Sequence, residues 1–137
     1  MTIALDTSAA VPFVMASHGA HRATRQRLGT KDLVLTQHSL AETYSVLTRL
    51  PGDARVAPED AVRLLAANFG EPALLPPADA RTLPALLAPL GISGGATYDA
   101  LVALAARAHA LPLATRDVRA AATYAALGVD IELVADG

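Results

Sequence analysis

The chain has 137 residues, of which 53% are hydrophobic and 18% are charged, and its formal net charge is −2. This length and composition predict one domain over residues 1–137, with a sizeable core and little disorder. Cysteine is absent, which excludes disulfides and thiolate metal sites, so a bound metal must take oxygen or imidazole ligands. The net charge offers no general attraction for a polyanion, and the absence of Trp argues against a platform for stacking nucleobases.

The first third of the chain predicts two strands separated by helices. Residues 3–5 form a short apolar run that predicts a strand, and residues 9–16 predict a helix in which Pro12 is tolerable only near the first turn. A basic helix over residues 20–28 precedes a second predicted strand at 33–35. No targeting segment is recognised in the first residues and no run of about 18 apolar residues occurs, so we expect a cytoplasmic protein without membrane contact.

The middle of the chain is predominantly helical. A helix is expected to begin at Ser39 and to stop before Pro51, and a second helix is expected over residues 58–68. Residues 73–75 are a weak strand candidate, and the stretch 79–90 predicts an interrupted helix.

The last third returns to alternating elements. We expect a flexible connection at 91–95, a helix at 97–110, a strand at 111–114, a helix at 117–127 and a last strand at 131–134. Short apolar strands that alternate with helices predict a mainly parallel sheet covered on both faces, which is a three-layer α/β/α sandwich.

Four acids occupy comparable places in these predicted units. Asp6 and Asp117 directly follow strand candidates, and Glu42 and Asp99 lie in the expected first turns of helices. Since a helix that follows a strand begins at the edge where the strand ends, Glu42 can join Asp6 and Asp117 at one rim of the sheet, and Asp99 can join them if its helix also begins there. That rim is where ligands bind in open parallel sheets.

Each acid also has a purely structural interpretation. Asp6 and Asp117 can cap helices, Ser39 and Glu42 fit a capping box, and Asp99 favours the positive end of its helix. Caps do not explain why the acids share one edge, where neighbouring carboxylates repel one another. A divalent cation relieves that repulsion, and Mg²⁺ or Mn²⁺ suits oxygen ligands and phosphodiester hydrolysis.

The chain resembles the PIN-domain nucleases and, within them, the VapC-type toxins of toxin–antitoxin pairs. The resemblance rests on residues 5–9 (LDTSA), 40–42 (LAE), 94–101 (GGATYDAL) and 113–117 (LATRD), in this order. It implies that Asp6, Glu42, Asp99 and Asp117 bind the metal and carry the catalysis. It further implies that hydroxyl groups orient these acids, and the candidates are Thr7, Ser8 and Thr115.

The resemblance also implies an activity and partners. The expected activity is endoribonuclease cleavage of RNA with Mg²⁺ or Mn²⁺, by a homodimeric toxin that a small antitoxin protein inhibits from a groove between helices. Some relatives carry a further acid two residues after the last Asp, where this chain has Arg119. The number of metal ions therefore stays open.

Several basic residues have two interpretations. Arg116 beside Asp117 can hold a substrate phosphate or be a solvated arginine. Arg22, Arg25 and Arg27 can form a basic rim for RNA or a solvated helix face, and His38 can touch the site or be structural.

Two other functions remain open at this point. In an aspartyl phosphatase or phosphotransferase Asp6 would be the nucleophile, although Ser8 stands where the usual signature has a second Asp. In a non-catalytic interaction protein the acids would only cap helices, and apolar helix faces around Val11 and Phe13 would bind a partner chain.

Overall fold

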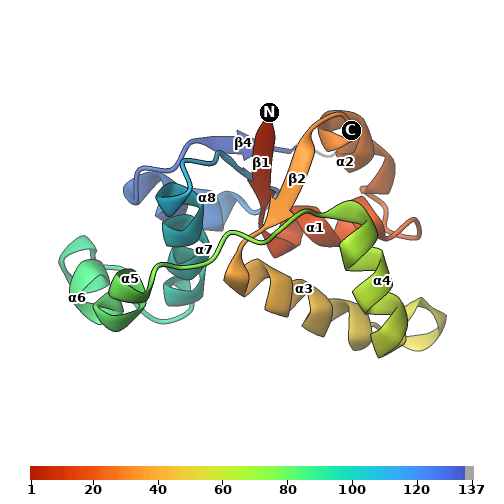
Figure 1. The fold of residues 1–137 in the computed structure, drawn as a ribbon, viewed down its shortest axis with the longest axis horizontal. Helices are drawn as coiled ribbons and strands as arrows, with labels where there is room; N and C mark the ends of the chain where they lie inside the picture. The colour runs from red at the N-terminus through yellow and green to blue at the C-terminus, as the bar shows by residue number, and fades with distance from the viewer. Residues whose placement is uncertain (135–137) are drawn as a thin grey trace.

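The computed structural model describes residues 1–134 and contains a four-stranded, fully parallel sheet (Figure 1). The strands are β1 (Thr2–Leu5), β2 (Asp32–Leu35), β3 (Leu113–Thr115) and β4 (Ile131–Leu133). They lie in the order β2-β1-β3-β4, and in this register Ala4 pairs with Val34 on one side and with Leu113 on the other. The four strands expected from the short apolar runs at 3–5, 33–35, 111–114 and 131–134 are confirmed.

The helices lie on both faces of this sheet. They are α1 (Thr7–Val14), α2 (His21–Leu28), α3 (Gln37–Thr48), α4 (Pro58–Asn68), α5 (Pro77–Arg81), α6 (Leu83–Leu87), α7 (Ala96–Ala108) and α8 (Val118–Ala126), with 3-10 turns η1 (Gly52–Ala54) and η2 (Ala88–Leu90). The step from β1 to β2 runs one way across the sheet, and the step from β3 to β4 runs the other way. Right-handed crossovers then place α1 and α2 on one face and α8 on the opposite face, so the predicted three-layer sandwich is confirmed.

Two apolar cores fill the space between the layers. Ile3 and Leu5 of β1 point to the face covered by α1 to α4, where they pack with buried side chains such as Leu35. Ala4 points to the other face, where it packs with Leu113 beneath α7 and α8. The alternation follows from the two-residue period of a strand, and burial on both faces explains why the strand sequences are continuously apolar.

Helix α1 begins earlier than its sequence indicates. Asp6 is its N-cap, so Pro12 stands at the sixth helical position, and the expectation that Pro12 lies in the first turn is wrong. A proline there removes one internal hydrogen bond, and the helix ends two residues later at Val14. Beyond the interruption, the Pro12 carbonyl accepts a hydrogen bond from Nδ1 of His21 at 2.8 Å, which connects the start of α2 to α1.

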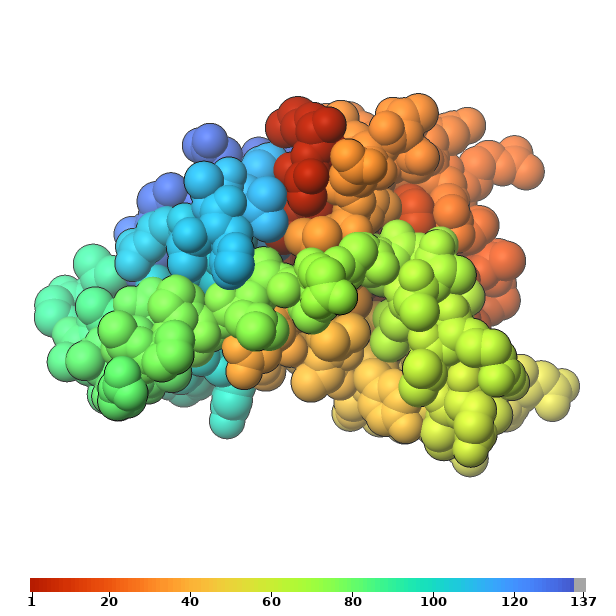
Figure 2. Space-filling view, in the orientation of Figure 1, coloured from red at the N-terminus to blue at the C-terminus, as the bar shows by residue number. Residues whose placement is uncertain are grey.

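The middle segment also departs from the prediction in two places. Residues 73–75 contribute a single bridge, Ala73 with Thr36, and no strand is found there among the described residues. Figure 2 shows this stretch running over one face of the molecule, between α4 and α5. The expected helix at 79–90 is divided into α5, α6 and η2, because Pro84 and Pro89 each interrupt the helical hydrogen bonds.

The strand order fixes where a site can form. Chain connections leave β1 and β3 in opposite directions, so the gap between the carboxyl ends of these two strands is the topological switch point of the sheet. Asp6 directly follows β1, and Asp117 lies two residues after β3. No helix in the described part of the chain is both long and apolar enough to cross a membrane.

Candidate active site

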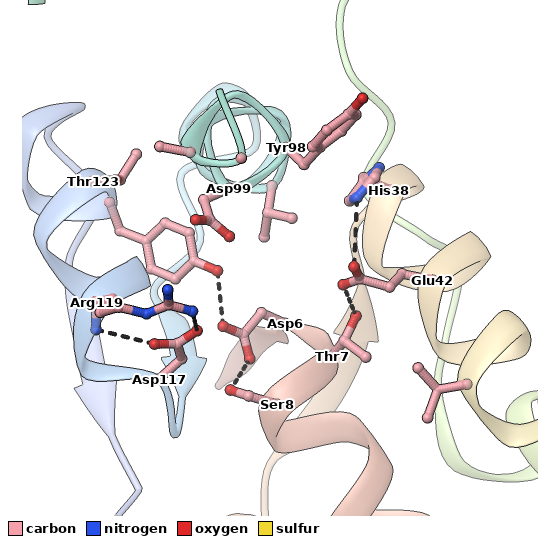
Figure 3. A pocket seen from close by; sticks show the side chains of 15 residues that line it. Asp6, Thr7, Ser8, His38, Glu42, Tyr98, Asp99, Asp117, Arg119 and Thr123 are labelled. Carbon is pink, nitrogen blue, oxygen red and sulfur yellow. Dashed lines mark hydrogen bonds and ion pairs between the residues drawn. The ribbon is translucent and has the colours of Figure 1, made fainter. Parts of the chain in front are cut away.

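A cavity of about 860 Å³ opens at this switch point, and all four predicted acids line it (Figure 3). They come from four elements, since Asp6 precedes α1, Glu42 lies on α3, Asp99 on α7 and Asp117 before α8. Asp6, Asp99 and Asp117 face one another, whereas Glu42 lies across the cavity beside Thr7 (Figure 3). The remaining lining residues are Ser8, His38, Val46, Gly95, Ala96, Tyr98, Val102, Arg119, Thr123 and Tyr124.

Asp6 is held rigidly at the base of this cavity. Its Oδ1 accepts hydrogen bonds from the Ser8 hydroxyl at 2.6 Å and from the Ala9 backbone N–H at 3.2 Å. Its Oδ2 accepts from the Thr115 hydroxyl at 2.5 Å and from the Tyr124 hydroxyl at 2.8 Å. A carboxylate has about four lone-pair positions, so these four donors engage the whole group.

Asp6 is only 4% exposed. This burial raises the pKa of Asp6, and its hydrogen bonds oppose the rise without cancelling it. Hydrogen bonds to every lone pair lower the nucleophilicity of Asp6, which counts against the aspartyl phosphatase interpretation. The negative charge of Asp6 can still attract a hydrated cation in the cavity.

The two carboxylate oxygens of Asp117 have different contacts. One of its oxygens, Oδ1, accepts the backbone N–H groups of Arg119 at 3.0 Å and of Ala120 at 3.3 Å, as expected of a helix N-cap. The other oxygen lies 3.8 Å from the guanidinium of Arg119, whose side chain is 93% exposed. Such an exposed pair stabilises little, so Arg119 leaves the negative charge of the cavity largely uncompensated.

The pKa of Asp99 depends on the other acids of the cavity. It caps no helix, because the N-cap of α7 is Gly95. Burial raises the pKa of Asp99, and the negative charges of Asp117, Asp6 and Glu42 raise it further, while Arg119 lowers it. The four acids thus form one electrostatic group, in which each ionised carboxylate disfavours the next.

Glu42 is not part of a helix cap. The capping box of α3 is formed by Thr36 and Ser39, so the expected box of Ser39 with Glu42 is wrong. Helix α3 begins at Gln37, and Glu42 therefore lies in its second turn and not in its first. The Glu42 carboxylate accepts a hydrogen bond from the Thr7 hydroxyl and lies 4.0 Å from Nε2 of His38.

The three hydroxyl groups expected to orient the acids all contact them or each other. Thr7 donates to Glu42, and Ser8 and Thr115 donate to Asp6. Thr115 also accepts the backbone N–H of Asp117 at 3.0 Å, which joins the two acids through one side chain.

Arg116 does not line the acid-lined cavity. It lies between Thr115 and Asp117, and neighbouring side chains in an extended segment point in opposite directions. Thr115 and Asp117 face the acids, so Arg116 lies on the other side of the segment and lines a second cavity near α2. The two-residue period was the sequence signal that could have separated Arg116 from its neighbours.

Tyr124 is the main site residue that the sequence predictions missed. Its side chain is buried and donates to Asp6, and desolvation together with the Asp6 charge raises the pKa of this tyrosine. The spacing of Asp117, Ala120 and Tyr124 along α8 was a usable signal, because residues three and four apart share a helix face.

Two further aromatic residues meet at the rim of the cavity. The rings of His38 and Tyr98 stack with centroids 5.7 Å apart, and both residues line the cavity. Contact between His38 and the site was one of the two interpretations left open from the sequence.

The donor set of this cavity suits a hard divalent cation. Among residues 1–134 no three His, Asp or Glu side chains converge closely enough to hold a metal ion as they stand. Mg²⁺ does not require such a cage, because it usually keeps several waters and takes one or two carboxylates directly. A wide cavity with four carboxylates and one weakly paired arginine fits a hydrated cation of this kind.

The site therefore defines an α/β/α protein with an acidic cavity at the switch point of its sheet, and comparison with known proteins gives its family. The family model of the PIN domain matches residues 3–126, and the chain belongs to the PIN-domain family. The chain is 50% identical over 133 residues to Ribonuclease VapC27 of Mycobacterium tuberculosis, covering 97% of each protein. It is 43% identical to Ribonuclease VapC40 of the same organism, covering 96% of this chain and 98% of that protein.

A solved structure has the same fold at much lower sequence identity. VapBC2 from Rickettsia felis, bound to a DNA fragment from its promoter, superposes with a TM-score of 0.67 at 15% identity. The match covers 97% of this chain and 98% of that chain. The PIN fold expected from the sequence motifs is thus confirmed.

Proposed function

We propose that this protein is a metal-dependent endoribonuclease that acts as the toxin of a toxin–antitoxin pair. The observation that carries the proposal is the single cavity lined by Asp6, Glu42, Asp99 and Asp117 at the topological switch point. Its relatives at 50% and 43% identity over almost the whole chain are named ribonucleases. RNA is accordingly the proposed substrate, and Mg²⁺ or Mn²⁺ the proposed cofactor.

The residues that would hold the cation are the four acids. When bound, a divalent cation supplies charge stabilisation for a phosphodiester oxygen and lowers the pKa of a water molecule. The protein positions the carboxylates before any cation arrives, since Asp6 is locked by four donors and Asp117 is fixed by its helix cap. Thr7 holds Glu42 toward the same cavity from the other side.

The acids also determine which substrates can approach. Four carboxylates repel a polyanion, so RNA can enter the cavity only when positive charge has been supplied there. The proposed cofactor thereby controls substrate binding as well as the chemical step.

The interaction-protein interpretation accounts for only half of the acids. Asp6 and Asp117 do cap helices, as that interpretation expects, but Asp99 and Glu42 cap none. A purely structural role gives no reason for Asp99 to be placed where three other acids raise its pKa.

The proposed partners are a second copy of the chain and a small antitoxin protein. An apolar groove of about 620 Å³ between α3 and α4, lined by side chains such as Leu40, Leu65 and Phe69, would suit an antitoxin segment. Apolar grooves between helices commonly bind amphipathic helices of partner proteins.

The function is tested by incubating the purified protein with a panel of RNAs, with and without Mg²⁺ or Mn²⁺. Cleavage that requires the cation and is lost in Asp99→Asn would support the proposal. Asp53→Asn is a matched control, because Asp53 lies in the η1 turn and does not line the cavity. Cation-independent cleavage, or equal cleavage by Asp99→Asn and the wild type, would refute it.

A further inference from the structure

A second cavity, of about 560 Å³, is basic where the first is acidic. Its lining residues are His18, Gly19, Ala20, Arg22, Ala23, Gln26 and Arg116. As far as residue 134, this lining contains two arginines and no acid. A concave surface lined by basic side chains is suited to an anion.

The three arginines of α2 have different environments. Arg25 donates to the Phe13 carbonyl at 2.8 Å and to Asn68 at 3.0 Å, and its guanidinium lies over the Phe13 ring. Arg27 pairs with Glu132 at 2.7 Å. The structure thus assigns both of these arginines to intramolecular contacts.

Arg22 is the exception. Its side chain is exposed, lines the basic cavity, and has no ion pair or hydrogen bond within the described part of the chain. It also stands in the first turn of α2, where a positive charge is unfavourable beside the helix dipole. An arginine that gains nothing from its intramolecular position is available for an anionic ligand.

One hydrogen bond joins the linings of the two cavities. The Ser8 hydroxyl, which lines the acidic cavity and donates to Asp6, accepts the backbone N–H of Arg116 at 2.8 Å. Asp117, the next residue, faces the acidic cavity, whereas Arg116 lines the basic one. Adjacent residues of one segment therefore belong to the linings of the two cavities.

Both cavities also lie toward the same edge of the sheet. Helix α2 is followed by β2, which begins beside Thr2 at the edge where the strands start. The helix therefore runs toward that edge, and its first turn, with Arg22, lies about 12 Å back toward the edge where the strands end. The four acids occupy that same edge.

His18 adds a donor to the basic cavity. Its Nδ1 accepts the backbone N–H of Ala20 at 3.0 Å, so the proton of the neutral ring resides on Nε2. The ring can thus donate one hydrogen bond to a ligand oxygen without becoming charged. The amide group of Gln26 supplies another possible donor at the same surface.

We propose that this basic cavity binds a backbone phosphate of the RNA, next to the phosphate that is cleaved at the acid-lined cavity. The proposal rests on the nuclease function proposed above and names a binding site for the same substrate. Arg22 and Arg116 would contact the phosphate, and His18 would donate to it from Nε2–H. The site would give the substrate a favourable contact that the acidic cavity does not provide without a cation.

The test is binding of a labelled single-stranded RNA, measured by fluorescence anisotropy with Mg²⁺ over a range of salt concentrations. The protein carries Asp99→Asn throughout, so that the RNA stays uncut. We expect the further substitution Arg22→Ala to weaken binding about fivefold and to reduce the salt dependence by about 0.7, the contribution of one phosphate on a single strand. Arg22→Lys should retain most of the salt dependence because it keeps the charge.

Arg81→Ala is the matched control, since it removes the same charge from α5, at the opposite end of the molecule from α2 (Figure 1). Arg22→Ala and Arg81→Ala with equal affinity and equal salt dependence would overturn the proposal. Cleavage by the protein without Asp99→Asn is measured separately. If that protein cleaves no RNA but Arg22→Ala still weakens RNA binding, the nuclease function fails and the phosphate site stands.

Discussion

The two cavities on either side of the Ser8–Arg116 contact differ in almost every property that matters for a phosphodiester. One is lined by four carboxylates and one exposed arginine, and the other by two arginines, a histidine and a glutamine. Residues 115–117 serve both, because alternate side chains of one extended segment face opposite sides. The comparison shows how a short sequence can place an acidic and a basic side chain next to each other in the chain and yet in different cavities.

The cavities also differ in how firmly their side chains are held. Asp6 has four hydrogen-bond donors at the base of the acidic cavity, whereas the Arg22 side chain extends into solvent. Rigid placement suits groups that act on reacting atoms, and a flexible arginine suits a contact that only retains the strand. Substitutions in the two cavities should therefore affect different kinetic constants.

The largest expected effect comes from the acidic cavity. Asp6→Asn should reduce kcat for RNA cleavage at least a hundredfold, since it removes a fixed negative charge from the proposed cation site. Steady-state kinetics measures the loss, and circular dichroism checks that the fold is retained. A kcat within a factor of three of the wild type would show that Asp6 is only a helix cap.

The next largest effect concerns Tyr124, whose hydroxyl donates a hydrogen bond to Asp6. Tyr124→Phe removes one of four donors to the carboxylate while it keeps the packing of the ring. We expect the affinity for Mn²⁺ to fall by about tenfold, as it does when other groups that orient a metal ligand are removed. Calorimetric titration measures this, and Tyr44→Phe is the control because Tyr44 does not line the acidic cavity. Equal affinities in the two variants would assign Tyr124 a packing role alone.

A smaller effect distinguishes the two neighbouring arginines, Arg116 and Arg119. Arg119→Gln should strengthen Mn²⁺ binding about twofold to threefold, because Arg119 is the one arginine among residues 1–134 that lines the acidic cavity. The effect is small because the Arg119 side chain is exposed and solvent screens its charge. Arg116→Gln should leave Mn²⁺ binding unchanged and raise KM for RNA. An effect of Arg116→Gln on Mn²⁺ binding, together with an effect of Arg119→Gln on KM alone, would contradict the proposed roles of the two cavities.

The smallest expected effect is on stability. The pKa of Asp99 is raised in the folded protein, so folding binds protons and the ionised form destabilises the metal-free protein above the raised pKa. Asp99→Asn should therefore raise Tm at neutral pH in EDTA, by about 1–3 °C because the carboxylate is partly exposed and solvent screens the repulsion. The difference should fade as the pH falls through the raised pKa and then below 3.8, because the carboxylate becomes protonated in both states. A Tm difference that persists at pH 3.5 would exclude this electrostatic origin.

The sequence predicts the sheet and its edge because the relevant signals are local. Strand β1 is a short apolar run that stops at Asp6, and β3 is a similar run that stops just before Asp117, so both acids can be placed without tertiary information. Asp99 follows from the start of a long Ala-rich helix. Asp6 and Asp117 need only the rule that parallel strands end at one edge, whereas Asp99 also requires that its helix begin at that edge.

Other features depend on contacts between distant residues. The start of α3 at Gln37 was instead a local signal that the prediction missed, since Thr36 and Ser39 form the capping box three residues apart and place Glu42 in the second turn. The role of Tyr124 depends on its contact with Asp6, 118 positions away in the chain. Arg25 and Arg27 could not be distinguished from Arg22 on the sequence, because their partners Phe13, Asn68 and Glu132 come from other elements.

The central claim is that four acids from separate elements form one cation site. Calorimetric titration of the metal-free protein with Mn²⁺ tests it most directly, with the wild type compared to Glu42→Gln and to Glu59→Gln, a control on α4 that does not line the cavity. The account predicts binding heat in the wild type and in Glu59→Gln, and strongly reduced heat in Glu42→Gln. Absence of binding heat in the wild type, or the same heat in Glu42→Gln, would contradict it.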